Sequence, residues 1–331
     1  MENPLTVIVD NASDKLGYNG GQWETEEAPN TFGGSQSVCF TDRPSGPSNV
    51  SFSFLGRSVE VYGTVDRSLV MKTVVNKAPY NPLDETAGAP TGRRGVKLFE
   101  AGLISGSHEV RLEPESGQLS IDYFIYSPVG KTKFNGEDLI FDDTHTSLNF
   151  TGPWTPMKVT DLPELPFNFT LLSTTQAGAS FSFAFTGESI SVFGGARPNA
   201  GRVSAEYTID GSSPTSVVTT NRRESQDGWT LHQEYFKYEV KEKPDAEHIL
   251  NVTVLEASEE QPFFLDYVIV RGNEHTEMAE RRFKKTGSDL SSAGMKIGLV
   301  IMAIVVGILL WVGWTFYRKR RKAKGFPPSQ R

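Results

Sequence analysis

The chain has 331 residues, which is too long for one small domain and enough for two of ordinary size. Aromatic residues make up 11% of the chain, and this excludes an intrinsically disordered protein. A net charge of −7 gives no general attraction for nucleic acid, so no nucleic-acid partner is expected. The single cysteine, Cys39, excludes an intrachain disulfide and a Cys-based zinc site, and we expect it to be a small buried side chain.

The first segment of the chain has a pattern that returns later. An apolar run from residue 5 ends in Asp10, and turn residues, Tyr18 and Trp23 follow it. The same order recurs over 139–154, where Asp142, Phe150 and Trp154 stand in the corresponding places.

The next segment alternates apolar and small polar residues, in "VSFSFLGRSVEVYG" at 50–63 and again in "ASFSFAFTGESISVFGG" at 179–195. A period of two predicts strands with one buried face. The glycines at 56 and 187 predict a hairpin or a tight corner between two such strands. The side chains that we expect in the core are Phe52, Phe54, Val59, Val61, Phe183, Phe185, Ile190 and Val192.

Two later landmarks also recur. "GSHEVRLEP" is similar to "AEHILNVTV", which places His108 and His248 at equivalent positions and predicts a structural role for both. Each copy then closes on an apolar strand that contains an Asp-Tyr pair, in "SIDYFIY" and "FLDYVIV". We expect Asp122 and Asp266 to hold a hydrogen bond or ion pair to an Arg or a backbone amide. Four landmarks in the same order indicate a duplicated domain.

The predicted fold class is all-β, with two tandem antiparallel β-sandwiches followed by a single transmembrane α-helix. The predicted parts, in chain order, are copy one (5–127), a linker (128–136), copy two (137–271), a juxtamembrane stalk (272–296), the transmembrane helix (297–317) and a basic tail (318–331).

The segment Ile297–Tyr317 contains no charged residue, and as a helix it would be about 31 Å long, which matches a bilayer core. The basic run "RKRRKAK" that follows favours a cytoplasmic tail with the N-terminal domains outside the cell or in a lumen. The bilayer is therefore a predicted partner. No signal peptide is visible, which leaves a tail-anchored protein with cytosolic domains as the alternative. Five sequons support the outside placement, at Asn11, Asn49, Asn149, Asn168 and Asn251.

These landmarks, together with "YTIDG" at 207–211, resemble the galactose-binding-like jelly rolls, and most closely the tandem copies in single-pass surface proteins of fungi. The resemblance covers about residues 5–271. Copy one departs from it, because "LVMKTVVNKAPYNP" stands where "YxIDG" is expected. The resemblance implies a jelly-roll sandwich that in many relatives binds sugars through its end loops, although the superfamily also contains purely structural modules.

Three tryptophans are the candidate sugar-binding residues, because the apolar face of a pyranose stacks on an aromatic ring. Trp229 lies in a polar insertion with no counterpart in copy one. Trp23 and Trp154 occupy matched positions, so the alternative is that they close the ends of the sandwiches. The candidate hydrogen-bonding neighbours are Tyr18, Arg197, Arg222 and Arg223.

Asp10, Asp142 and Asp143 have oxygen atoms of the kind that bind calcium, but their spacing is not that of a dedicated calcium loop. No nucleophile elbow, metalloprotease motif or phosphate loop is present. The sequence thus predicts no catalytic residues, no metal and no cofactor. The predicted function is a non-catalytic, membrane-anchored surface protein that binds glycan or cell-wall carbohydrate. The alternative is a structural, adhesion or sensor ectodomain with a protein partner.

Overall fold

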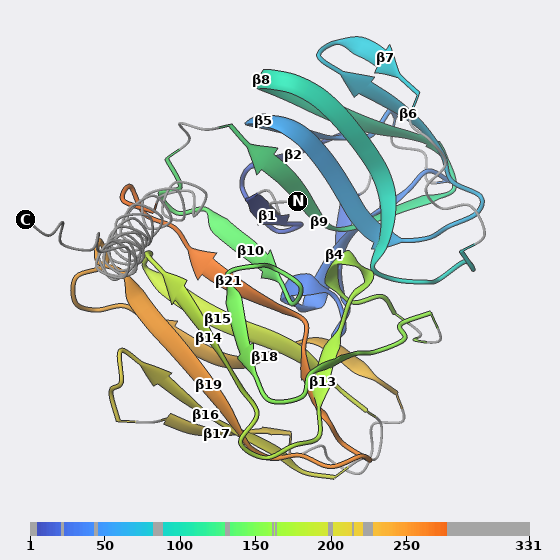
Figure 1. Cartoon of the computed structure of the whole chain (residues 1–331). Helices are drawn as coiled ribbons and strands as arrows, with labels where there is room; N and C mark the ends of the chain where they lie inside the picture. Colours follow the sequence, from blue (N-terminus) through green and yellow to red (C-terminus); the bar gives the residue numbers. More distant parts are fainter. Residues whose placement is uncertain are drawn as a thin grey trace, which may run out of the picture. The chain divides into compact units, whose positions relative to one another are not determined.

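The computed structural model describes residues 5–20, 23–42, 46–81, 89–129, 133–160, 162, 164–197, 201–213, 215–220 and 228–276. This part of the chain is built from antiparallel strands and two short 3₁₀ turns, η1 (Phe32–Gly34) and η2 (Phe167–Phe169) (Figure 1). The all-β prediction is therefore confirmed for the described residues.

Copy one contributes nine strands, several of them long. In chain order they are β1 (Thr6–Asp10), β2 (Leu16–Asn19), β3 (Trp23–Glu27), β4 (Ser35–Phe40), β5 (Asn49–Thr64), β6 (Val70–Val75), β7 (Ala78–Tyr80), β8 (Val96–Ser116) and β9 (Gln118–Pro128).

Copy two contributes twelve shorter strands. In chain order they are β10 (Asp138–Asp142), β11 (Leu148–Thr151), β12 (Thr155–Pro156), β13 (Leu172–Thr174), β14 (Ser180–Phe185), β15 (Ser189–Ala196), β16 (Val203–Ile209), β17 (Thr215–Thr220), β18 (Thr230–Glu239), β19 (His248–Glu256), β20 (Phe263–Leu265) and β21 (Tyr267–Arg271).

The recurring "SFSF" phrase forms one bent strand in copy one and two strands in copy two. β5 continues through Gly56 with a register shift before Ser58, whereas the chain leaves β14 for β15 around Gly187. β14 and β15 belong to different sheets and do not pair with each other. The glycine thus marks a tight corner, and the hairpin alternative is wrong.

The largest sheet runs through both copies. Its main path is β18-β15-β21-β10-β1-β9-β5-β8-β6-β7, and equivalent strands stand in the same order on either side of the β1/β10 junction. β1 and β10 are antiparallel, with Thr6 opposite Ile140 and Ile8 opposite Asp138. Because Thr6 is equivalent to Asp138 and Ile8 to Ile140, this register is the self-complementary contact of an approximate two-fold axis.

A shared hydrophobic core lies at the junction, and we call it the seam core. It consists of five pairs of equivalent residues, namely Ile8/Ile140, Phe32/Phe167, Tyr62/Phe193, Tyr123/Tyr267 and Ile125/Ile269. Nine of these side chains are buried, and Phe193 is partly buried against them. Each copy therefore supplies one half of a common core.

The predicted core positions are confirmed. The eight Phe, Val and Ile side chains of the two "SFSF" segments are all 7% exposed or less, and Cys39 is fully buried. Both matched histidines are bonded locally, since His108 Nε2 lies 2.7 Å from Ile104 O and His248 Nε2 lies 3.0 Å from Lys243 O. The structural role predicted for them agrees with these contacts.

The two buried aspartates of the closing strands hold the 3₁₀ turns. The amide of Phe32 donates to Asp122 Oδ2 at 3.3 Å, and the amide of Phe167 donates to Asp266 Oδ1 at 3.1 Å. This is the hydrogen bond to a backbone amide that the sequence predicts. Burial raises the pKa of both carboxyls well above the usual range of aspartate.

Within the described residues, no helix has the length and apolar character needed to cross a membrane. The predicted transmembrane segment 297–317, the basic tail 318–331 and the stalk beyond residue 276 lie outside the described part of the chain.

Candidate functional site

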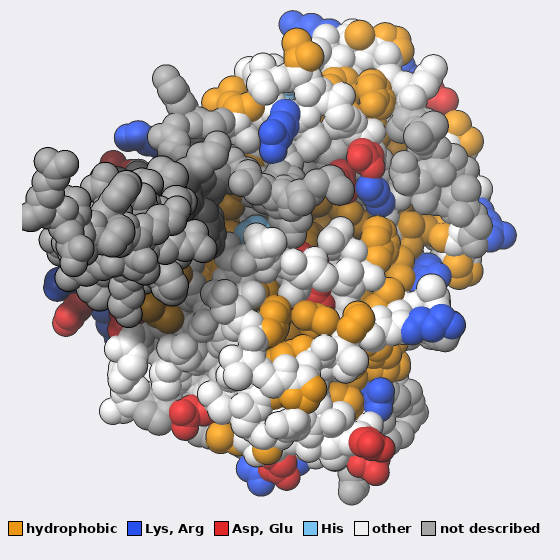
Figure 2. All heavy atoms as spheres, in the orientation of Figure 1, with side chains coloured by type: hydrophobic (Ala, Val, Ile, Leu, Met, Phe, Trp, Pro, Cys, Tyr) orange, Lys and Arg blue, Asp and Glu red, His pale blue; other side chains and the backbone are white. Residues whose placement is uncertain are grey.

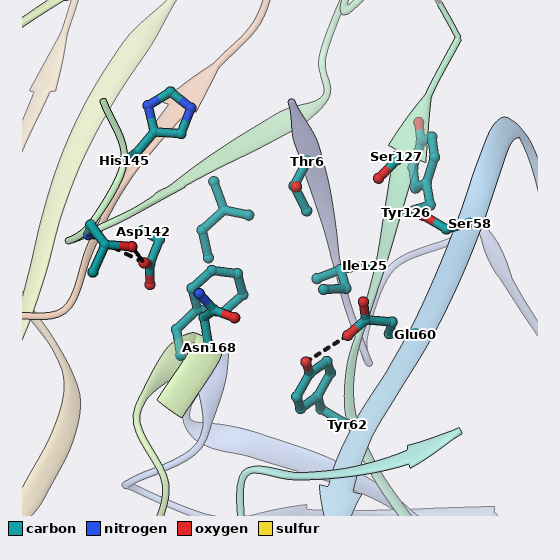
Figure 3. A pocket seen from close by; sticks show the side chains of 13 residues that line it. Thr6, Ser58, Glu60, Tyr62, Ile125, Tyr126, Ser127, Asp142, His145 and Asn168 are labelled. Atoms are coloured by element: carbon teal, nitrogen blue, oxygen red, sulfur yellow. Dashed lines mark hydrogen bonds between the residues drawn. The ribbon is translucent and has the colours of Figure 1, made fainter. Parts of the chain in front are cut away.

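A pocket of about 240 Å³ lies where the two copies meet, and we call it the seam pocket (Figure 3). Copy one lines it from β1, β5 and β9, and copy two from β10, the turn after β10 and η2. The lining residues are Thr6, Ser58, Glu60, Tyr62, Ile125, Tyr126, Ser127, Ile140, Asp142, Thr144, His145, Phe167 and Asn168.

Two carboxylates belong to the lining of this pocket, Glu60 from β5 in copy one and Asp142 from the end of β10 in copy two (Figure 3). Glu60 accepts a hydrogen bond of 2.7 Å from the hydroxyl of Tyr62, and Lys97 Nζ lies 3.4 Å from the same oxygen. These two partners hold the Glu60 carboxylate in place on the copy-one side.

Asp142 is fixed by two threonines. Thr144 donates to its Oδ2 through both the hydroxyl and the backbone amide, the latter at 3.2 Å. Thr170 Oγ1 lies 2.9 Å from Asp142 Oδ1 and 2.7 Å from Asp143 Oδ1, so one hydroxyl links the two neighbouring carboxyls. Burial, and then the charge of Asp142, raises the pKa of Asp143 to about 7.

His145 closes one end of the pocket. Its Nδ1 accepts a hydrogen bond of 3.2 Å from the amide of Ser147, and its ring meets the edge of Phe141 at 5.1 Å. Burial lowers the pKa of His145, although the charge of Asp142 opposes this. The imidazole is therefore neutral at pH 7, and with Nδ1 accepting, its proton is on Nε2.

A second pocket lies on the symmetric side of the β1/β10 junction and differs in charge. It is lined by Ile8, Val9, Asp10, Ala12, Ser13, Asp14, Lys15, Gly136, Asp138 and Arg271. Lys15 pairs with Glu137, and Arg271 pairs with Asp138 at 3.0 Å. The residue of copy two that is equivalent to Lys15 is Ser147, and the residue of copy one that is equivalent to Arg271 is Ser127. The seam pocket consequently has carboxylates in its lining but no Lys or Arg.

The two matched tryptophans lie elsewhere. Trp23 packs on Tyr18 with ring centroids 4.8 Å apart, and Trp154 packs on Phe150 at 5.1 Å. Both pairs occupy equivalent places in the two copies, and neither tryptophan lines the seam pocket. Each of these tryptophans therefore packs on an aromatic side chain of its own copy.

Trp229 is half-buried against the domain. Its ring lies 5.4 Å from that of Phe264, the guanidinium of Arg197 lies 5.9 Å from its centroid, and Asn30 Nδ2 donates to its carbonyl at 3.2 Å. It does not line the seam pocket either. Arg222 and Arg223 lie outside the described residues.

The five sequons differ in exposure. Asn149, Asn168 and Asn251 are exposed and Asn49 is half-buried, whereas Asn11 is fully buried beside Ser37. A glycan on Asn11 would not fit the folded structure, so glycosylation is not expected at this position. Asn168 lines the seam pocket, and a glycan there would compete with a ligand.

Charged side chains do not gather into one patch among the described residues on the face seen in Figure 2, where Lys, Arg, Asp and Glu are scattered between hydrophobic and uncharged surface. In the same part of the chain, no cluster of three or more His, Cys, Asp or Glu side chains is arranged to hold a metal ion. The seam pocket is thus the candidate site. Its lining combines two carboxylates, Glu60 and Asp142, with apolar side chains.

No family model matches the chain. It is 27% identical over 200 residues to a protein from Flavonifractor plautii described as an A type blood α-D-galactosamine galactosaminidase, and the match covers 58% of this chain and 17% of that relative. Two solved structures are similar to parts of this chain. One is a two-domain esterase active on acetylated mannans (17% identity, 45% of this chain and 39% of that chain, TM-score 0.32). The other is the α-glucuronidase BtGH115A (16% identity, 36% and 16%, TM-score 0.25).

The similarity to a galactosaminidase corrects one prediction. The sequence motifs indicate a protein without catalytic activity, and the named activity of the relative contradicts that interpretation. The absence of short motifs does not bear on glycosidases, because hydrolysis of a glycosidic bond needs only two carboxylates at a suitable separation, and these need not be close in the sequence.

Proposed function

We propose that the chain recognises carbohydrate and that the seam pocket is where a sugar binds. The observation that carries this proposal is the similarity, over 58% of the chain, to a protein named as a galactosaminidase. The chain spans 17% of that relative's length, so the relative's activity and substrate are taken here only as a guide to the class of ligand.

The lining supports a sugar ligand in three ways. Its volume is below the range of about 300–1,000 Å³ that drug-sized ligands use, which suits a single ring. Ile125, Ile140 and Phe167 offer an apolar surface to the C–H face of a pyranose. Glu60 and Asp142 accept hydrogen bonds from hydroxyls. Lys97 offsets the charge of Glu60, so the charge of Asp142 is what favours a protonated amino sugar over an acidic one.

Calorimetric titration of the full chain with methyl α-D-galactosaminide tests this proposal. We expect one sugar bound per chain, and a loss of affinity of at least about tenfold in Asp142→Asn, because a charge-assisted hydrogen bond contributes roughly 1.5–3 kcal/mol. Asp138→Asn, on the other side of the junction, is the matched control and should bind like the wild type. No heat of binding with galactosaminide, galactose or glucuronide would refute the proposal.

A second candidate function is hydrolysis of a glycoside in the same pocket. The observation that favours it is the presence of two carboxylates, Glu60 and Asp142, in the lining of one pocket, since most glycosidases use a pair of carboxyl groups. Water would add across the bond, with its oxygen joining the anomeric carbon and a proton going to the leaving oxygen. Release of nitrophenol from nitrophenyl α-galactosaminide by the wild type, but not by Glu60→Gln or Asp142→Asn, would establish it.

We further propose that the two copies are galactose-binding-like jelly rolls displayed at a membrane by the segment 297–317. The absence of charge over this segment and the basic run after it support an anchor with a cytoplasmic tail. The outward placement of the domains would bring the seam pocket to extracellular or lumenal glycans. A cytosolic placement with a tail anchor is the alternative that glycosidase treatment distinguishes.

A further inference from the structure

The turn that borders the seam pocket carries backbone strain in only one of the two copies. In η2, Asn168 has φ of 50° and Phe169 has φ of 60°. A positive φ is tolerated by asparagine but is a genuine outlier for a bulky residue such as phenylalanine. In copy one the equivalent positions are Gly33 and Gly34, with φ of 67° and 77°, where glycine adopts this conformation without strain.

The side chain at the strained position is exposed next to residues that line the pocket, although Phe169 itself is not one of the lining residues. Phe169 is 40% exposed, whereas its chain neighbour Phe167 is buried. The ring of Phe169 lies 6.5 Å from that of Tyr62, which lines the seam pocket, as do its chain neighbours Phe167 and Asn168. A Cβ built on the equivalent Gly34 meets nothing within 4 Å, so this corner of the fold does not need a side chain to fill it.

We propose that Phe169 is a stacking platform for the sugar bound in the seam pocket, an inference that rests on the function proposed above. The ring would cover the apolar face of a pyranose whose hydroxyls point to Glu60 and Asp142. A residue kept in an unfavourable conformation, with its side chain exposed beside a pocket, fits a binding role better than a packing role. Copy one, with glycines at this turn, would have no such platform, and one sugar per chain follows.

The substitution Phe169→Gly tests the proposal because it moves stability and binding in opposite directions. Glycine removes the strain, so the melting temperature of the full chain should rise or stay equal. The affinity for methyl α-D-galactosaminide should fall by about two- to tenfold, since aromatic contacts of this kind are worth roughly 0.5–1.5 kcal/mol. Phe169→Trp should keep the affinity within about threefold, because the larger ring preserves the stacking surface.

The control is Tyr238→Ala, which removes an aromatic of nearly the same exposure, 39%, from β18, a strand that contributes no residue to the lining of the seam pocket. It should bind the sugar like the wild type. If the wild type binds but Phe169→Gly binds equally well, the platform is refuted while the proposed function stands. If Phe169→Gly melts at a lower temperature, Phe169 is a packing residue and the inference fails. If the wild type binds no sugar, the proposed function fails first.

Discussion

Arg271 and Asp138 form an ion pair across β21 and β10, with Nη1 3.1 Å and 3.0 Å from the two carboxylate oxygens. The two-fold related positions hold Ser127 and Thr6, because Ser189 lies opposite Arg271 in the same way that Ser58 lies opposite Ser127. The pocket on one side of the junction is thus lined by paired charges. The other side presents small hydroxyl side chains to a pocket that contains carboxylates.

A positive charge introduced at position 127, where the equivalent residue of copy two is Arg271, should block the seam pocket. In Ser127→Arg the guanidinium would pair with a lining carboxylate and repel an amino sugar, so we expect binding of methyl α-D-galactosaminide to weaken by more than about tenfold. Calorimetry measures the affinity, and a melting curve checks the fold. Ser53→Arg adds the same charge to an exposed position of β5 outside the lining and should bind normally. Equal affinities in the two variants would count against the seam pocket.

The Asp143 carboxyl predicts a defined pH dependence. Its pKa is raised from 3.8 to about 7, so between these values the folded chain keeps a proton that the unfolded chain loses. The free energy of unfolding should therefore fall as pH rises from about 4 to 7. Asp143→Asn removes this loss, and copy one already has Asn11 at the equivalent position.

Urea unfolding at pH 4 to 8 checks this prediction. Compared with the wild type, Asp143→Asn should have the same free energy of unfolding at pH 4. At pH 8 its free energy of unfolding should be higher by at most about 4 kcal/mol, since one pKa unit corresponds to about 1.4 kcal/mol. His232, whose pKa is lowered to about 4 by burial, acts in the opposite direction in the same range, but it is present in both proteins and cancels in the difference. A difference that does not change with pH would contradict the assignment to Asp143.

The sequence predicts the fold of each copy better than it predicts the site. The alternation in the "SFSF" segments identifies the core because burial of one strand face repeats every two residues. The matched Asp122 and Asp266 are recognisable because a buried carboxylate beside apolar residues needs a fixed partner. Copy one has "VVNK" at 74–77 where copy two has "TIDG" at 208–211, but the backbone turn is the same. Asn76 and Lys77 adopt positive φ as Asp210 and Gly211 do, so the turn is kept with different residues.

The seam pocket is not predictable in the same way. Its lining comes from two copies joined edge to edge, and no property of a single strand reveals that β1 and β10 pair. Reasoning from residue type favours tryptophans, which here pack against their own copies. The available signal is the comparison of matched positions, where Ser127 and Thr6 replace the charged Arg271 and Asp138.

Two glycines of the repeat should be intolerant of any side chain. A Cβ on Gly63 would lie 1.9 Å from Ser120 O, and one on Gly194 would lie 2.0 Å from Phe264 O. We expect Gly194→Ala to lower the free energy of unfolding by about 1–3 kcal/mol, as overpacking does. Gly102→Ala, whose Cβ meets nothing within 4 Å, is the control and should change stability little. Urea denaturation distinguishes the two, and equal stabilities would show that the strands can separate.

The segment 297–317 should anchor the chain in a bilayer. Membranes washed with alkaline carbonate should retain the full chain and release a variant that lacks residues 297–331. With the domains outside, glycosidase should increase the mobility of the wild type, and less so that of Asn149→Gln/Asn251→Gln. Recovery of the full chain in the soluble fraction without detergent would contradict the anchor.

Mapping of NMR chemical shifts during a titration with methyl α-D-galactosaminide shows where on the protein the sugar binds. If the junction between the copies binds one sugar, the shifts should saturate at one equivalent and should be largest at Thr6, Ser127 and Thr144. The indole protons of Trp23 and Trp154 should change little. Shifts centred on the tryptophans, or two equivalents at saturation, would show that the sugar does not bind at the junction.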